Sequence, residues 1–290
     1  MIVWLNGALH DESKAKLDLR DRGLLLGDGL FETLLARRGR VALLEEHIGR
    51  LRAGASLLGI PFPHDTRSLG MACGAVLEAN GMTQQADRAA LRITLTRGPG
   101  PRGLALPAKP TPTLMISANP SPAPASSQTA ALVTLRRNAH SPTSRLKVLS
   151  YLDNILARQE AQAKGADEAL LLDTMGFLSC ASVANIFLWE GERLITPSED
   201  CAILPGVTRA VVIELARSLS LEVAEERISV ERLAKASGGF LTNSLIGLQP
   251  LTRIDGRNMH VHRLTGRLAA AYDVLLDAAD EEEDEPIRRS

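Results

Sequence analysis

Residues 145–154 read Arg-Leu-Lys147-Val-Leu-Ser-Tyr151-Leu-Asp-Asn, and this segment holds one of six lysines among the 33 basic residues of the chain. Lys147 lies between a strand-like stretch and the start of an apolar helix, so we expect its amine to be partly buried. Burial disfavours the ammonium form, and the nearby Arg145 acts in the same direction. A neutral amine of this kind is nucleophilic near neutral pH. The segment therefore indicates a lysine that forms a Schiff base, although a surface lysine at a helix start has a similar local sequence.

A series of ordered elements follows this segment. The pattern predicts a helix over 152–164 closed by Gly165, a strand over 169–173, a turn at 174–176 and a hairpin over 190–192. Leu-Pro-Gly-Val-Thr-Arg at 204–209 then precedes a helix over 210–219. A glycine ahead of a helix lets the first N–H groups of the helix face an anion, which the helix dipole also favours. Residues 204–209 therefore predict a phosphate-binding turn, with an ordinary N-cap at Thr208 as the alternative.

Together these segments resemble the class IV aminotransferases, the pyridoxal-phosphate (PLP) enzymes of fold type IV. In the C-terminal half the similarity lies in Lys147 with Tyr151, Gly176, Asn185-Ile-Phe, Thr196-Pro197 and the 204–209 segment. In the N-terminal half, Asp21-Arg-Gly-Leu-Leu-Leu-Gly-Asp-Gly-Leu-Phe31-Glu-Thr33 and Leu44-Glu-Glu-His-Ile-Gly-Arg50-Leu51 resemble the family's opening strand and first helix. The match runs from about residue 3 to residue 274. The resemblance implies an α+β enzyme of two α/β domains with PLP in the interdomain cleft.

Composition suggests where these domains begin and end. Residues 118–127 are rich in proline and serine, as is typical of a linker. We expect an N-terminal α+β domain over 1–117, an interdomain linker over 118–130, a C-terminal PLP-binding domain over 131–279 and an acidic disordered tail over 280–290. The tail holds six acidic residues and two arginines, so the rest of the chain carries a net charge of +3. That charge suits anionic small molecules and is far from a nucleic-acid footprint.

The resemblance also implies roles for single residues. Lys147 would bind PLP as a Schiff base. Arg50 and the backbone N–H groups of Val207 and Thr208 would hold the phosphate, and the hydroxyl of Ser244 would add a further donor. Tyr151 would lie near the 3′-oxygen of the cofactor, unless it is a core aromatic, and Arg50 has the alternative of a solvated helix residue. The implied cofactor-binding residues are Arg50, Lys147, Tyr151, Cys180, Val207, Thr208 and Ser244.

One position departs from the family. Relatives usually have a glutamate four residues after the glycine of the turn, where its carboxylate pairs with the pyridine nitrogen of PLP; here that residue is Cys180. A carboxylate keeps the ring cationic and strengthens it as an electron sink, whereas a thiol is a weak hydrogen-bonding group. Three explanations remain open: a specialised enzyme, another acid that reaches the nitrogen, or a protein that binds PLP without catalysis.

Two motifs bear on the subgroup. Arg97-Gly-Pro-Gly-Pro-Arg102-Gly103 is similar to a loop of 4-amino-4-deoxychorismate lyases, and Asn243-Ser-Leu245 is closer to those lyases than to branched-chain or D-amino-acid transaminases. Phe31, Arg102 and Asn243 are the implied substrate-binding residues. We therefore expect a lyase of folate biosynthesis that forms 4-aminobenzoate and pyruvate. The alternative is a class IV aminotransferase that uses a D-amino acid or a branched-chain amino acid with 2-oxoglutarate. Arg102 matches the D-specific carboxylate trap, but Phe31 and Leu104 replace its tyrosine and histidine.

Other classes of function are less compatible with the sequence. No run of 18 apolar residues and no signal-peptide pattern is present, so we expect a cytoplasmic protein without membrane contact. Three distant cysteines argue against a disulfide framework or a metal site. A mononucleotide-binding protein would also use the glycine turn at 206, but it has no need of Lys147. We expect a small substrate with an amino group and a carboxylate, no nucleic acid and, from the resemblance, a homodimer.

Overall fold

Strand β3 (Gly29–Arg37) lies in the first of two units into which the chain divides in the computed structural model, which describes residues 1–84 and 88–282. The first unit comprises Met1–Ala123 together with Leu146–Ser150, and the second comprises Pro124–Arg145 together with Tyr151 onward. The short segment that carries Lys147 therefore belongs to the first unit, although residues before and after it belong to the second.

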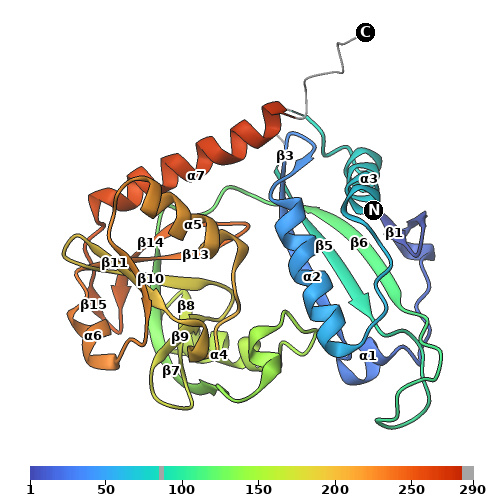
Figure 1. Cartoon of the computed structure of the whole chain (residues 1–290), viewed down its shortest axis with the longest axis horizontal. Coiled ribbons are helices and arrows are strands. Elements are labelled where there is room, and N and C mark those ends of the chain that lie inside the picture. The colour runs from blue at the N-terminus through green and yellow to red at the C-terminus, as the bar shows by residue number, and fades with distance from the viewer. Residues whose placement is uncertain (85–87, 283–290) are drawn as a thin grey trace. The chain divides into compact units, whose positions relative to one another are not determined.

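The first unit is an antiparallel sheet of six strands with two long helices (Figure 1). The strand order is β2-β1-β6-β5-β3-β4. Its elements are β1 (Ile2–Leu5), β2 (Ala8–Asp11), η1 (Glu12–Lys14), α1 (Arg22–Leu26), β3, β4 (Arg40–Val41), α2 (Leu44–Leu58), α3 (Thr66–Ala79), β5 (Arg88–Thr96) and β6 (Thr113–Pro120).

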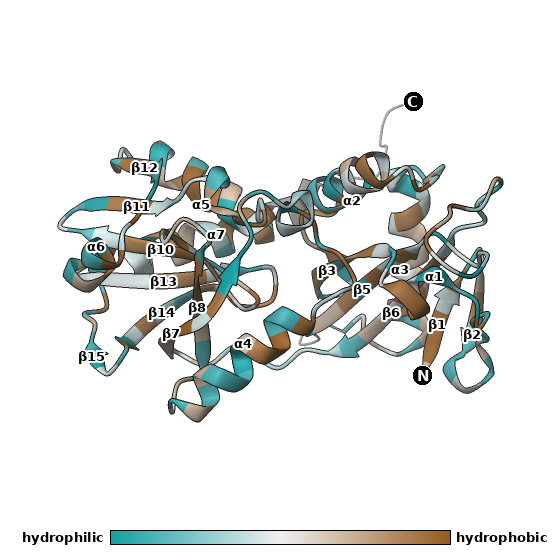
Figure 2. Cartoon of the chain, turned by 90° about the horizontal axis from the view of Figure 1, so that it is seen from below, coloured by the Kyte–Doolittle hydropathy of each residue, from teal (hydrophilic) through white to brown (hydrophobic). Residues whose placement is uncertain are grey.

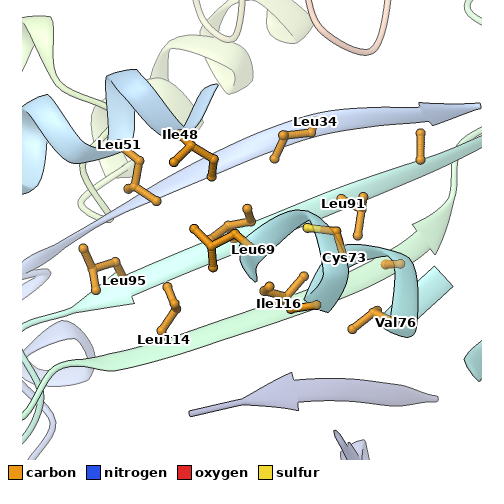
Figure 3. Packing of buried hydrophobic residues seen from close by; sticks show 14 of the residues in the cluster. Leu34, Ile48, Leu51, Leu69, Cys73, Val76, Leu91, Leu95, Leu114 and Ile116 are labelled. Carbon is orange, nitrogen blue, oxygen red and sulfur yellow. The ribbon is translucent and has the colours of Figure 1, made fainter. Parts of the chain in front are cut away.

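Helices α2 and α3 cover one face of this sheet. Because strand side chains alternate between faces, every second residue of β3, β5 and β6 points toward the helices. Figure 3 shows the resulting core, in which sheet leucines meet side chains of α2 and α3. The labelled residues are Leu34, Leu91, Leu95, Leu114 and Ile116 from the strands and Ile48, Leu51, Leu69, Cys73 and Val76 from the helices.

The opposite face of the sheet is more polar. In the antiparallel register of β3 and β5, Phe31 pairs with Thr94 and Thr33 pairs with Arg92. Directly paired residues point to the same face, so these four side chains share the face that α2 and α3 leave uncovered. We call it the open face of the first sheet.

The second unit is built on a nine-stranded mixed sheet of order β12-β11-β10-β13-β14-β7-β8-β9, with β15 paired to β14. Helices α5 and α7 pack on one face over Phe187, Trp189 and Phe240, and α4 packs on β7 and β8. The elements are β7 (Gln128–Arg137), η2 (Pro142–Arg145), α4 (Leu152–Ala163), β8 (Glu168–Asp173), β9 (Leu178–Ala181), β10 (Asn185–Glu190), β11 (Arg193–Pro197), η3 (Glu199–Cys201), α5 (Val207–Ser218), β12 (Val223–Glu226), α6 (Val230–Lys235), β13 (Gly238–Asn243), β14 (Gly247–Ile254), β15 (Arg257–Asn258) and α7 (Arg263–Glu282).

Most local expectations agree with these elements, and one does not. Helix α4 and strand β8 fall within one residue of the predicted bounds. Helix α5, however, starts at Val207 rather than Ala210. Gly206 is its N-cap residue and Thr208 lies inside the first turn, so the alternative that Thr208 is an ordinary N-cap is wrong.

The expected domain bounds stay a prediction, although the two units meet in sequence at Ala123 and Pro124, inside the predicted linker 118–130. Strand β6 ends at Pro120 and β7 begins at Gln128. Of the predicted acidic tail 280–290, residues 280–282 are the last of α7, and residues 283–290 lie outside the described residues. None of the helices in the described ranges is both long and apolar enough to cross a membrane.

Leu51→Ala should lower the free energy of unfolding by about 2–5 kcal/mol, because it deletes a buried leucine and leaves a cavity. Leu57→Ala in the same helix is the matched control: its side chain is 63% exposed against 2% for Leu51, and we expect little change. Chemical unfolding of both variants checks the prediction, and equal effects would contradict the described orientation of α2.

Candidate active site

Lys147 is positioned by a short extension of the first sheet. The N–H of Phe31 donates to the carbonyl of Lys147 at 2.9 Å, and the N–H of Leu149 donates to the carbonyl of Gly29 at 3.1 Å. Leu30 faces Val148 across this antiparallel bridge. Since side chains alternate, Val148 packs into the core with Leu30 while Lys147 lies with Phe31 on the open face.

A glycine is required where the extension meets the sheet. A Cβ on Gly29 would lie 2.4 Å from the carbonyl oxygen of Leu95 and 2.7 Å from a methyl carbon of Leu149. The leucine methyl can move, but the backbone oxygen of Leu95 cannot, so a glycine at this position lets β5 lie close against β3. Part of the Gly27-Asp-Gly29 motif thus has a steric explanation.

Two cationic side chains contact the Phe31 ring. The Nζ atom of Lys147 lies 4.3 Å from the ring centroid, and the guanidinium carbon of Arg92 lies 3.7 Å from it. The Nε of Arg92 also donates to the hydroxyl of Thr94 at 3.2 Å. Cations over an aromatic face are attracted by the ring quadrupole. The open face therefore brings an amine, an aromatic ring and a guanidinium into one place.

Behind this face lies a buried ion cluster centred on Glu32. Arg50 donates two hydrogen bonds to the Glu32 carboxylate, from Nε to Oε1 at 2.8 Å and from Nη2 to Oε2 at 2.7 Å. The Nδ1 atom of His47 lies 2.8 Å from the same Oε2. Burial opposes ionisation of Glu32, but the hydrogen bonds from Arg50 and His47 outweigh it and lower the pKa of Glu32 to about 2. Arg50 is therefore held in a defined orientation by an ionised partner.

The surroundings of Lys147 favour its neutral form. Desolvation lowers the pKa of Lys147 to about 8; Glu32 opposes the shift, and Arg50 and Arg92 add to it. Against an ordinary lysine, this increases the neutral fraction near neutral pH by about two orders of magnitude. The burial expected from the sequence is thus present, and the cations that reinforce it are Arg50 and Arg92.

The glycine-rich loop of the first unit contains arginines with different surroundings. Arg97 is buried: it donates to the carboxylate of Asp28 through Nε and Nη2 and also caps the last carbonyls of α2. Arg22 also donates to the Asp28 carboxylate, through its Nε. Its Nη1 donates to the carbonyls of Gly103 and Ala105, and these bonds fix the end of the glycine-rich loop. Arg102 is exposed, and within the described residues no side chain is recorded as its partner.

The start of α5 in the second unit is an uncapped helix N-terminus. Gly206 is the N-cap residue and offers no side chain to the first N–H groups of the helix, those of Val207 and Thr208. A Cβ at Gly206 would lie 2.0 Å from Oδ1 of Asn185, whose Nδ2 donates to the carbonyl of Leu204 at 3.0 Å. Asn185 therefore shapes the turn, and the helix presents free N–H groups suited to an anion.

The turn between β13 and β14 is organised by Asn243. Its Oδ1 accepts hydrogen bonds from the N–H groups of Leu245 and Ile246 at 2.9 and 3.0 Å, and its Nδ2 donates to the carbonyl of Val183 at 3.1 Å. These bonds use the amide to build the turn that carries Ser244. The substrate-binding role expected for Asn243 stays a prediction, and its described contacts are structural.

Cys180 lies on β9 in an apolar setting. It is buried in a cluster with Cys201, Ile203 and Phe177, and the hydroxyl of Ser179 lies 3.7 Å from its sulfur. Asp200 adjoins this cluster, with its Oδ1 3.8 Å from the sulfur of Cys201. Tyr151 is the residue that precedes the first turn of α4 and is half-buried.

Three residues of this arrangement were missed in the sequence. Glu32 stands within the Phe31-Glu-Thr33 segment and Arg22 within Asp21–Thr33, and nothing in the local sequence distinguishes either of them. Arg92 lies in β5, where the alternation of side chains puts Arg92, Thr94 and Thr96 on one side of the strand. These polar side chains on one side of a strand could have indicated a functional face, but only the pairing with β3 places that face beside Phe31 and Lys147.

Comparisons with known proteins agree with these features. The family described as amino-transferase class IV matches residues 29–254. A protein of Methanocaldococcus jannaschii that carries the name of a branched-chain-amino-acid aminotransferase is 37% identical over 280 residues, covering 94% of this chain and 95% of that protein. The aminodeoxychorismate lyase of Bacillus subtilis is 30% identical over 259 residues, covering 89% and 88%.

A solved structure shares the whole architecture. The branched-chain aminotransferase of Thermoproteus uzoniensis, determined with norvaline, superposes with a TM-score of 0.89 at 29% identity, covering 97% of this chain and 96% of that one. The matches extend across both units and include transaminases and a lyase. The chain therefore belongs to the class IV aminotransferase family, the PLP-dependent transaminases and lyases of fold type IV.

Proposed function

We propose that this chain binds PLP through Lys147 and converts 4-amino-4-deoxychorismate into 4-aminobenzoate and pyruvate. The observation that carries the proposal is the setting of Lys147, an amine of lowered pKa beside Phe31 and Arg92 on the open face of the first sheet. An ordinary surface lysine would have neither the desolvation nor the adjacent cations.

The donor groups of the chain fit the cofactor. PLP needs an amine for its aldehyde and donors for a phosphate, and, when bound, it withdraws electrons from the substrate carbon that bears the amino group. Lys147 supplies the amine, and the uncapped start of α5 supplies the N–H groups of Val207 and Thr208. We propose that Arg50, oriented by Glu32, and Ser244 complete the phosphate site. The location of PLP in an interdomain cleft and the role of Tyr151 stay predictions.

Lys147 is also our candidate for moving protons. Once released from the cofactor, its Nζ would take a proton from the substrate carbon that bears the amino group and return it during departure of pyruvate, since a tethered base acts at high effective concentration. The substrate carries two carboxylates. We propose exposed Arg102 and open-face Arg92 as their binding residues, with Phe31 as an apolar wall.

Cys180 favours the lyase over the transaminase within this proposal. Loss of pyruvate is driven by the aromaticity of 4-aminobenzoate, so it tolerates a weaker electron sink than reversible transamination does. Cys180 packs with Cys201, Ile203 and Phe177, and its thiol is a weaker partner for a pyridine nitrogen than a carboxylate would be. The lyase-like Asn243-Ser-Leu245 turn and the pinned loop that holds Arg102 give additional support.

A branched-chain aminotransferase is the second candidate. It is favoured by the 37% identity to the Methanocaldococcus jannaschii protein and by Arg92, because 2-oxoglutarate also brings a second carboxylate to the site. The D-amino-acid alternative has less support, since the residues that would accompany Arg102 are Phe31 and Leu104.

We propose that the protein acts as a homodimer in the cytoplasm. Each unit exposes leucine-rich helix surface: α1 exposes Leu24 and Leu25, and α4 exposes Leu152 and Ile155. Hydrophobic and hydrophilic residues alternate along α4 (Figure 2). Leu152 and Ile155 are three positions apart and so lie on one face of α4, and adjoining exposed apolar side chains are typical of interaction sites.

Reduction of the PLP-loaded protein with borohydride, followed by peptide mapping, should place the cofactor-derived mass on Lys147. Lys147→Ala should lose this label and its turnover, whereas Lys109→Ala, at an exposed lysine, should keep both. The rate at which apoprotein captures PLP should rise with pH through about 8, because the neutral amine attacks. A label on another lysine would contradict the assignment.

A side-by-side assay with 4-amino-4-deoxychorismate, with L-leucine plus 2-oxoglutarate and with D-alanine plus 2-oxoglutarate tests the reaction. We expect 4-aminobenzoate and pyruvate in equal amounts from the first and slow or absent amino transfer in the other two. Transfer from L-leucine without formation of 4-aminobenzoate would replace the lyase by the aminotransferase.

Glu32→Gln should destabilise the protein by about 3 kcal/mol at neutral pH, the scale for breaking a buried ion pair. The pKa of Glu32 is lowered from 4.5 to about 2 by folding, so its carboxylate stabilises the fold above pH 4.5 and loses this effect as the pH falls toward 2. The difference in free energy of unfolding between wild type and variant should therefore shrink in acid. Glu46→Gln, at an exposed site of α2, is the control, and a difference that is independent of pH would argue against the ion pair.

A further inference from the structure

The hydroxyl of Thr242 is buried without a partner. Thr242 is 1% exposed, and its Oγ1 makes no hydrogen bond within the described residues. A polar group that loses its hydrogen bonds to water on burial and gains no new partner costs free energy, so such groups are rare in native structures. Valine has nearly the same shape and would fill this position without that cost. The Thr242 hydroxyl is therefore available to donate a hydrogen bond to a bound ligand.

The sheet register places this hydroxyl near the start of α5. Thr242 on β13 pairs directly with Asn185 on β10, so both side chains lie on one face. Phe187 and Phe240, the next pair on that face, stack at 5.0 Å beneath α5. The Asn185 side chain reaches Gly206, the N-cap residue of α5. Thr242 is thus the neighbour of the residue that shapes the uncapped helix N-terminus.

The donors around the start of α5 favour an anion with several acceptor oxygens. The first N–H groups of α5 point outward without a side-chain cap, and a hydroxyl can turn its hydrogen toward the same acceptor. A phosphate monoester offers three oxygens, enough for two helix N–H groups and a hydroxyl. No cation is needed in this position for the bond to form, since the helix dipole already favours the charge.

We propose that Thr242 is a further phosphate ligand of this chain, donating its hydroxyl hydrogen to a phosphate oxygen of PLP beside the N–H groups of Val207 and Thr208. The inference rests on the proposed binding of PLP. It adds a buried donor beneath the helix N-terminus to the half-buried turn residue Ser244 and to Arg50.

Thr242→Val separates ligand binding from folding, because the two effects have opposite signs. Loss of an unsatisfied hydroxyl should leave the melting temperature of the apoprotein unchanged or higher. Loss of a donor to a charged phosphate should weaken PLP binding by about 10-fold or more. Thr242→Ser, which keeps the hydroxyl, should bind PLP within about threefold of wild type.

Titration of apoprotein with PLP, followed by absorbance, and with pyridoxal, which lacks the phosphate, supplies the readout. Thr242→Val should lose affinity for PLP and keep that for pyridoxal. Thr196→Val is the matched control, because Thr196 is equally buried but donates to the carbonyl of Ile186 at 2.8 Å. It should lower the melting temperature of the apoprotein.

The outcomes distinguish the inference from the proposal on which it rests. Wild-type affinity for PLP in both Thr242→Val and Thr242→Ala, while wild type itself binds tightly, overturns the role of Thr242 alone. An equal loss of affinity for PLP and pyridoxal also overturns it, since the effect is then not on the phosphate. Failure of wild type to bind PLP overturns the proposed function together with the inference.

Discussion

Two backbone hydrogen bonds between β3 and the segment Leu146–Ser150 determine where the amine of this protein lies. They join residues more than a hundred positions apart and make the segment an added strand of the first sheet. Because strand side chains alternate, this register sends Val148 into the core and Lys147 to the open face. A shift by one residue would exchange the two and bury the amine among leucines. Gly29 supports this arrangement, since a side chain there would collide with the backbone of β5 at Leu95.

Two adjacent residues of β3 make contacts on opposite faces of the sheet. Phe31 faces Lys147 and Arg92 on the open side, while Glu32 faces His47 and Arg50 on the helix side. Desolvation lowers the pKa of Lys147; the Glu32 carboxylate opposes this shift, and Arg50 and Arg92 add to it. The alternation of side chains along β3 thus keeps the Glu32–Arg50 ion pair and the Lys147 amine on different sides of the sheet.

The second unit contributes groups of another kind. Its relevant donors are backbone N–H groups and hydroxyls, arranged around Gly206, Asn185 and the turn at Asn243. Cys180 lies in an apolar cluster of the same unit, where relatives usually have a glutamate. Under the proposed function, Cys180 would be a weak partner for the pyridine ring, which suits a reaction whose product supplies its own driving force. This is the physical link between Cys180 and the proposed elimination of pyruvate.

The sequence alone was sufficient for what depends on local order. The series of motifs identified the family, Lys147 and the glycine turn before α5, because each is a contiguous signal and their order along the chain is informative. Roles that depend on pairing between distant residues were not accessible. Arg97 stood in a loop motif suggestive of ligands, yet it is buried on Asp28; Arg92 resembled an ordinary strand residue, yet it contacts the Phe31 ring. Spacing along a strand shows which residues share a face. The packing of strands and helices decides which other residues that face contacts. It therefore also decides which arginine is structural and which is available for chemistry.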